Sequence, residues 1–184
     1  MIAMSIANGT GGFHLLVRAK NAQSRHGIVA FGPFRFPCAL GRGGVTSMKR
    51  EGDGAAPRGR FRLARVYYNP LHVPRPRTGL PISVLRRDDG WCNGIGDRNS
   101  NRPVRHPYPA SAERLWRDDG LYDLVVVIDC NLRPRVQGRG SAIFMHIATP
   151  ELRPTEGCIA LSRPHLTRLI ERLRPATRIT IGRQ

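Results

Sequence analysis

Two residues that can act together as a nucleophile and a base lie close to each other in the sequence. His146 lies near the end of the apolar stretch 141–147, and Cys158 follows twelve residues later, directly after Gly157. A thiol attacks as the thiolate, and a cysteine with an ordinary pKa of ~8.5 is mostly protonated at neutral pH. A neighbouring imidazole can take that proton and later return it to a leaving amine. If a turn brings the two side chains together, the pair predicts acyl transfer through a thioester.

The residues just before Cys158 suit the same chemistry. Gly157 lets the backbone turn closely before the nucleophile, and Thr155 stands two residues further upstream. We predict that these two residues support the backbone where N–H groups face a developing oxyanion. Taken alone, one cysteine and one histidine are more often a buried thiol and a structural histidine, and that alternative stays open at this point.

The elements that must position this pair are predicted to be mostly β-strands. The run Val125–Ile128 is β-branched throughout, which is typical of a strand buried on both faces. Other segments show the apolar alternation or short apolar runs of strands. Strands are expected at residues 13–18, 27–31, 36–40, 60–68, 82–85, 121–129, 141–147 and 177–181.

One helix is predicted from a clear apolar stripe. It runs from Arg163 to Leu173, with Ser162 as the N-cap candidate and Pro175 ending it. A second, short helix is expected over Ser111–Arg117. The fold class is therefore mostly β, with one C-terminal packing helix and short helical decorations.

Composition limits the classes of protein that remain. The 184 residues favour one domain, which we place at 13–184 after a short extension at 1–12. No apolar run approaches the ~20 residues of a membrane-spanning helix. The four cysteines form no CxxC pair and no Cys/His cluster, so no metal site is expected. Cys38, Cys92 and Cys130 are interpreted as structural.

The charge of the chain points to anionic surroundings. Thirty Lys and Arg residues against thirteen Asp and Glu give a net charge of +17. Nucleic acid and an anionic cell envelope are both candidate partners. The basic residues are scattered along the chain and form no block of five or more like charges. An aromatic content of 7% is also low for a surface that stacks on bases. Nucleic acid is therefore the less favoured of the two.

Three motifs, in order along the chain, resemble the L,D-transpeptidase catalytic-domain (YkuD) family. The family signature is a His, a variable loop and then Ser/Thr-His-Gly-Cys, which stands here as His146 and residues 155–158. Residues 49–61 are similar to the family's Lys…Gly-Asp-Gly-x-Thr-Pro-x-Gly-x-Phe stretch. Trp91-Cys92, 101–104 and 121–125 resemble a proteobacterial branch of the family. The resemblance covers about residues 13–182, and it departs from the pattern at Glu156, where the family usually has His.

The resemblance implies a β-sandwich or barrel-like catalytic domain that acts on peptidoglycan stem peptides as donor and acceptor. Cys158 would attack a stem-peptide carbonyl, and His146 would serve as base and then as acid. The implied product is a cross-link important for the cell wall and cell shape. No cofactor and no nucleic acid are implied, and a monomer is expected. The alternative enzymatic function is that of an L,D-carboxypeptidase or amidase, in which water hydrolyses the same thioester.

Three further residues are candidates for substrate binding. Arg102 has the fork geometry that binds a carboxylate, although a structural ion pair with Asp97 or Asp123 is the more common role. Arg139 is a candidate to line the cleft, with a plain loop arginine as the alternative. Trp91 either covers the site or packs beneath it.

The compartment follows from two opposed observations. The resemblance implies work on the wall and thus the periplasm, which we adopt as the expectation. The first twelve residues carry no positive charge and only a short apolar stretch, which is poor for a signal peptide, so the cytoplasm is the alternative.

The four cysteines give a direct test of which one is the nucleophile. A carbapenem offers a strained β-lactam carbonyl, so we expect it to acylate Cys158 and add its mass to the protein. Intact mass spectrometry followed by peptide mapping locates the adduct. An adduct on Cys38, Cys92 or Cys130 instead would show that the wrong cysteine was chosen.

Overall fold

Eight strands make up the body of the protein. The computed structural model describes residues 14–183, so the predicted extension 1–12 lies outside the described residues. The eight strands are β1 (His14–Ala19), β2 (His26–Phe31), β3 (Phe34–Ala39), β6 (Gly59–Tyr68), β11 (Leu124–Ile128), β12 (Phe144–Ile147), β13 (Ile159–Leu161) and β14 (Arg178–Arg183).

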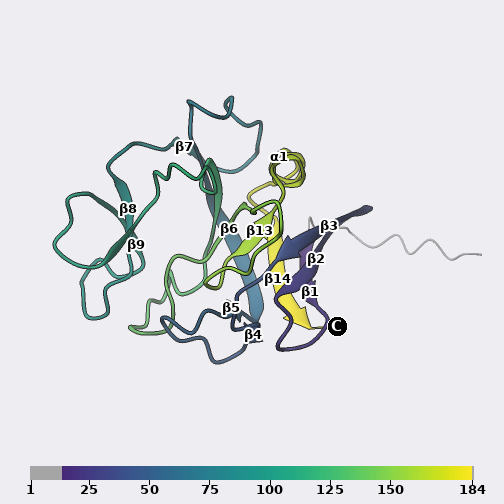
Figure 1. Ribbon diagram of the computed structural model, residues 1–184, viewed down its shortest axis with the longest axis horizontal. Coiled ribbons are helices and arrows are strands. Elements are labelled where there is room, and N and C mark those ends of the chain that lie inside the picture. The colour runs from purple at the N-terminus through teal and green to yellow at the C-terminus, as the bar shows by residue number, and fades with distance from the viewer. Residues whose placement is uncertain (1–13, 184) are drawn as a thin grey trace, which may run out of the picture.

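These strands close into a mixed β-barrel. Their order is β11-β12-β13-β3-β2-β1-β14-β6, and β6 pairs back with β11 to complete the circle. A further strand, β7 (Ile82–Val84), adds to β6 on the outside of that circle. The pairs β1–β14, β12–β13 and β6–β7 are parallel, and the remaining barrel pairs are antiparallel. The mostly β fold and the barrel-like architecture predicted from the sequence are confirmed (Figure 1).

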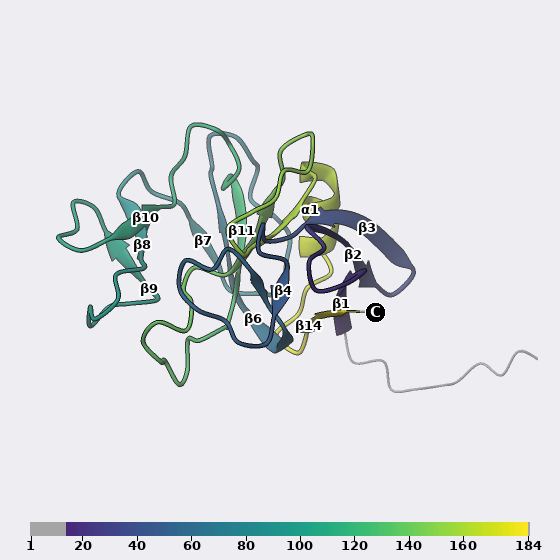
Figure 2. The same cartoon turned by 60° about the horizontal axis from the view of Figure 1, so that its bottom comes forward.

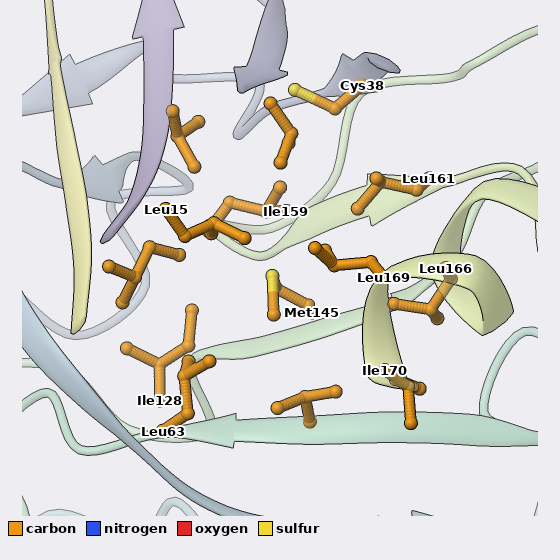
Figure 3. Close-up of a cluster of buried hydrophobic side chains, with 14 of the residues drawn as sticks. Leu15, Cys38, Leu63, Ile128, Met145, Ile159, Leu161, Leu166, Leu169 and Ile170 are labelled. Atoms are coloured by element: carbon orange, nitrogen blue, oxygen red, sulfur yellow. The ribbon is translucent and has the colours of Figure 1, made fainter. Parts of the chain in front are cut away.

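The barrel interior is filled by every second residue of its strands. Leu15, Met145 and Ile159 come from three different strands and are fully buried together. Figure 3 shows these side chains converging with those of helix α1 (Arg163–Ile170). Leu166, the first buried residue of α1, packs into the same core because the apolar stripe of the helix faces the barrel.

Helix α1 begins where the sequence predicts and ends earlier. It starts at Arg163 and stops at Ile170, and the remaining predicted residues 171–173 form a turn. Ser162 occupies the N-cap position, but its side chain makes no capping hydrogen bond. A capping serine accepts from the second or third helical N–H, and Pro164 removes one of these donors.

A small lobe stands between β7 and β11 in the chain. It contains the three-stranded antiparallel sheet β10 (Ala112–Arg114), β8 (Asp89–Cys92) and β9 (Arg102–Arg105). In Figures 1 and 2 this lobe projects from the side of the barrel opposite β1 and β2. The helix predicted over Ser111–Arg117 is wrong, and α1 is the single helix in residues 14–183. Isolated short helices are marginal, so pairing of this segment with β8 prevails.

The lobe gives the barrel a second hydrophobic cluster on its outer face. Val125 and Val127 point outward from β11, while Val126 between them points into the barrel. Strand β11 is thus buried on both faces, as its β-branched run predicts. Phe144 and Cys158 belong to the outer cluster, where they meet residues of the lobe and its flanking loops.

A two-residue ribbon supports the glycine-rich loop near the start of the chain. Strands β4 (Val45–Thr46) and β5 (Ala56–Pro57) pair in parallel and flank that loop. Asp53 within it accepts hydrogen bonds from the N–H groups of Arg50 (2.8 Å) and Ala55 (2.9 Å), as expected for a turn-capping carboxylate. Within residues 14–183, no helix is long and apolar enough to cross a membrane.

The position of Ile159 in the barrel core generates a stability prediction. Its side chain is fully buried, so Ile159→Ala should lower the free energy of unfolding by about 2–5 kcal/mol, measured by denaturant titration. Val84→Ala, at a 44% exposed position on β7, should change it by less than about 0.5 kcal/mol. Equal effects of the two substitutions would contradict the assignment of Ile159 to the interior.

Candidate active site

Strands β12 and β13 bring His146 and Cys158 to the same face of the barrel. The two strands are parallel, with Met145 opposite Ile159 and His146 opposite Ala160. Cys158 precedes Ile159 by one residue and therefore lies beside Phe144, on the outer face that His146 also shares. His146 and Cys158 both line one cavity of about 550 Å³. The turn predicted between them thus does bring them into one site.

The thiol of Cys158 is buried at the floor of this cavity. It donates a hydrogen bond to the carbonyl oxygen of Ala142 (Sγ···O 3.3 Å) and accepts one from the N–H of Phe144 (3.4 Å). Burial raises the pKa of Cys158 to about 12, and the nearby Glu113 carboxylate adds to that effect. At neutral pH the resting nucleophile is therefore a thiol.

His146 is held by the backbone in the form that can accept a proton. Its Nδ1 lies 2.8 Å from the carbonyl oxygen of Ile147, which can only accept, so Nδ1 carries the hydrogen and Nε2 has a free lone pair. Burial lowers the pKa of His146 to about 4, which keeps the imidazole neutral. The Tyr122 ring packs edgewise against it at 5.1 Å and fixes its plane.

No hydrogen bond joins Cys158 directly to His146 within the described residues. The thiol hydrogen points to Ala142, so it must swing toward Nε2 when the substrate arrives. Catalytic hydrogen bonds are often long before the substrate complex forms and tighten within it. Ala142 itself has φ +51°, a left-handed conformation that costs an alanine about 1–2 kcal/mol. That conformation is part of what directs its carbonyl oxygen at the thiol.

Gly157 and Thr155 shape the turn that precedes the nucleophile. Gly157 has φ +123°, and a Cβ there would lie 2.8 Å from the carbonyl oxygen of Ala55, so glycine is required. Thr155 Oγ1 donates to the carbonyl oxygen of Cys158 (2.7 Å) and accepts from the N–H of Gly157 (3.2 Å). The Cys158 N–H donates to no group in residues 14–183 and is free to face an oxyanion.

The amide side chain of Asn101 holds the floor of the site together. Its Oδ1 accepts from Trp91 Nε1 (2.9 Å) and from the N–H of Ala142 (3.1 Å). Its Nδ2 donates to the carbonyl oxygens of Cys130 (3.1 Å) and Asn131 (2.8 Å). Asn101 thereby fixes the residue whose carbonyl receives the Cys158 thiol. Asn101 lies within the third motif, next to Arg102, which was the predicted binding residue.

The structure does not bring the three predicted substrate-binding residues to the cavity wall. Trp91 is buried below the cavity, with its ring edge-on to Phe144 at 5.1 Å, so it packs beneath the site. Arg102 is exposed on β9, and Arg139 is exposed in a turn. The structural ion pair suggested for Arg102 with Asp123 is also absent from the described residues, since Asp123 pairs with Arg163 and His72.

Other charged residues line the cavity instead, and their spacing in the sequence did not reveal them. They come from separate loops and from the lobe, so no local pattern joins them. They are Glu51, Glu113, Arg117, Arg153 and Glu156. Residues 14–183 contain no group of three or more His, Cys, Asp or Glu side chains that could hold a metal ion.

Lys49, the first residue of the second motif (residues 49–61), places a positive charge near Cys158. Its ammonium group pairs with Asp53 and donates to the carbonyl oxygen of Arg50 (2.9 Å), and its side chain is 10% exposed. This positive charge favours the thiolate form of Cys158, against the larger effect of burial. The lysine and the glycine-rich loop therefore belong to the electrostatic surroundings of the nucleophile.

Glu156, which stands where the family usually has His, lies at the rim of the cavity. Its carboxylate accepts two hydrogen bonds from Arg42 Nε, at 2.7 and 2.9 Å, and the side chain is 74% exposed. Ala160 also lines the cavity. The departure at Glu156 thus leaves the thiol and imidazole in place and alters the cavity entrance.

A buried thiol and a neutral imidazole in one cavity, with a free backbone donor beside the thiol, are the groups that an enzyme of the cysteine acyl-transfer class requires. Comparison with known proteins agrees with this class. The model of the L,D-transpeptidase catalytic domain (YkuD) matches residues 26–181, and the chain belongs to that family. No curated protein matches the chain. The family resemblance seen in the sequence is confirmed, and family membership implies L,D-transpeptidase-type activity.

The protonation states of the site predict how Cys158 reacts with iodoacetamide as the pH changes. Because the thiolate is the reactive form and burial raises the pKa of Cys158 to about 12, its alkylation rate should keep rising with pH. Free N-acetylcysteine, measured in parallel, should level off above its ordinary pKa of ~8.5. Peptide mapping assigns the modified cysteine. A rate that is already maximal near neutral pH would mean a thiolate–imidazolium pair and contradict the neutral site.

Proposed function

We propose that this protein is a peptidoglycan L,D-transpeptidase that cross-links stem peptides through a thioester on Cys158. The observation that carries the proposal is the shared cavity of Cys158 and His146, with Nε2 of the imidazole free to accept a proton. Family membership supports the reaction type. The third motif, formed by Trp91-Cys92, residues 101–104 and residues 121–125, supports placement of the protein in the proteobacterial branch of the family.

The first half of the proposed reaction uses three groups of the site. The donor carbonyl carbon is attacked by Cys158 Sγ as the thiol proton moves to Nε2 of His146. The Cys158 N–H faces the oxyanion, with Thr155 holding the peptide unit that follows. Collapse breaks the C–N bond, and the imidazolium returns its proton to the departing D-amino acid. The thioester and a free amine are the products.

The second half exchanges the thioester for a new amide. The amine of a second stem peptide attacks the thioester carbonyl, the C–S bond breaks, and the thiolate leaves. A proton from the amine returns to sulfur through His146. If water attacks in place of the amine, the same enzyme is an L,D-carboxypeptidase, which is the alternative outcome of the experiment below.

Two arginines of the cavity are suited to bind substrate carboxylates. Arg117 lines the cavity, with its guanidinium over the Tyr122 ring at 5.0 Å and paired with Asp119. Arg153 lines the cavity from the loop between β12 and β13 and lies 3.5 Å from Glu151. We assign to them the substrate-binding role predicted for Arg102 and Arg139, here as the binding of carboxylates. The net charge of +17 would concentrate anionic wall material around the cavity. We place the reaction in the periplasm, which fractionation of cells expressing the native gene would check.

Incubation with a disaccharide-tetrapeptide tests the proposed function directly. Intact mass spectrometry should detect an acyl-enzyme on the unmodified protein and none on Cys158→Ser, since the hydroxyl is a much weaker nucleophile in this neutral site. Liquid chromatography of the products should show cross-linked dimers. A Cys158→Ser variant that cross-links at the parent rate would refute the assignment of the nucleophile.

His146→Ala serves as the matched variant in the same assay. Loss of the base should slow acylation by about 10²–10⁴-fold while the fold, followed by circular dichroism, is unchanged. Products that contain tripeptide without any dimer would identify the hydrolytic alternative in place of cross-linking.

A further inference from the structure

The cavity carries more acidic groups than the charge of the chain would suggest. In a protein of net charge +17, three carboxylates line it: Glu51, Glu113 and Glu156. Glu156 is paired with Arg42 at the rim, and Glu51 accepts a hydrogen bond from Ser141 (2.8 Å). Glu113 forms no ion pair with any residue of the described chain. Glu51 forms no ion pair with the described residues either, but its carboxylate receives the Ser141 hydroxyl, whereas Glu113 lies beside the tyrosine that packs against His146.

Glu113 is held next to the catalytic histidine by one side chain. The Tyr122 hydroxyl donates to its Oε1 at 2.6 Å, and the ring of the same tyrosine packs against His146. No hydrogen bond to Oε2 exists within residues 14–183, so this oxygen is available to a ligand. Strand β10 fixes the backbone, because Glu113 pairs there with Trp91 below the site.

We propose that Glu113 binds the ammonium group of the acyl acceptor and takes one proton from it before the amine attacks the thioester. The proposal rests on the transpeptidase function above and assigns a residue to its second half. A carboxylate oxygen without a cation, in the cavity that holds the thioester, is the group that recognises an ammonium ion by a charge-assisted hydrogen bond.

The proton balance of this step requires such a group. An ammonium ion has no lone pair, so it must lose one proton to become a nucleophile. That proton goes to Glu113, and the neutral amine then attacks the thioester carbon while the C–S bond breaks. The second amine proton passes through His146 to the sulfur. The products are the amide, the Cys158 thiol and a protonated Glu113, which releases its proton to solvent.

The surroundings of Glu113 suit both parts of this role. Burial raises the pKa of Glu113, which makes it a better proton acceptor than an exposed carboxylate. His146 has one free nitrogen, Nε2, because Nδ1 donates to the carbonyl oxygen of Ile147, and the proton of sulfur uses that nitrogen. A division of labour follows, in which His146 exchanges protons with sulfur and the leaving amine, and Glu113 accepts the proton of the entering ammonium ion.

The test compares Glu113→Gln with the unmodified protein on two acceptors. Each protein is incubated with disaccharide-tetrapeptide and either a stem-peptide amine or hydroxylamine, which is uncharged at neutral pH. For the stem-peptide amine we expect the ratio of transfer to hydrolysis to fall about 10²-fold in Glu113→Gln. For hydroxylamine, which needs no proton removed before attack, we expect the ratio to stay within a few-fold of the unmodified protein.

Two further variants separate this role from a merely structural one. Glu113→Asp keeps a carboxylate and should retain more amine transfer than Glu113→Gln. Glu171→Gln, an exposed glutamate at the end of α1 that pairs with Arg172, should behave like the unmodified protein. As the pH approaches the pKa of the free amine, the ratio of transfer to hydrolysis in Glu113→Gln should rise toward that of the unmodified protein. The acceptor amine is then already deprotonated when it binds.

The outcomes distinguish this inference from the function on which it rests. Failure of the unmodified protein to form an acyl-enzyme would overturn the transpeptidase proposal, and the role of Glu113 with it. An acyl-enzyme that forms normally, with an unchanged transfer ratio in Glu113→Gln, would overturn only the role of Glu113. Equal losses with the amine and with hydroxylamine would also overturn it, because they would show a positioning effect on the whole site.

Discussion

The parallel pairing of β12 with β13 is the constraint on which the active site depends. In this register, Met145 and Ile159 point into the barrel core, while His146 and Cys158 point outward into the cavity. Side chains alternate along a strand, so a shift of one residue in either strand would turn its catalytic group into the core. The buried apolar neighbours therefore hold the chemical groups in place. The turn through Gly157 makes the parallel arrangement possible, because its backbone passes against Ala55 where no side chain fits.

Burial sets the chemical state of the site as well as its geometry. Loss of water raises the pKa of the thiol and lowers that of the imidazole, so both groups rest in their neutral forms. Proton transfer must then accompany attack on the substrate, rather than precede it. Asn101 accepts a hydrogen bond from the N–H of Ala142, and the carbonyl oxygen of Ala142 accepts the hydrogen bond of the Cys158 thiol. This network holds the thiol in its resting position. Family membership accounts for the thiol and imidazole, while this network explains how the chain holds them ready.

The cavity and the rest of the surface differ in charge. The chain as a whole is strongly basic, which suits an anionic wall. Inside the cavity, Arg117 and Arg153 are accompanied by the carboxylates of Glu51, Glu113 and Glu156. A site with both signs fits a substrate that carries carboxylates and an amine, whereas a uniformly basic cavity would repel an ammonium ion. In the proposed function, the overall charge would favour encounter with an anionic wall, and the local arrangement of charges would serve the reaction.

The sequence by itself determined the long strands, the C-terminal helix and the pairing of Cys158 with His146 in one site. The β-branched run Val125–Ile128 and the apolar stripe of α1 are local patterns that report burial directly, and the signature around Cys158 is local too. Tertiary structure decided what depends on distant partners. Strands β8 and β10 are too short to show a period, and pairing between them replaced the expected helix at Ser111–Arg117. The same reason explains the cavity wall. Arg102 and Arg139 stood near motifs, but Glu113 and Arg117 reach the cavity because the lobe folds against the barrel, which residue spacing along the chain does not encode.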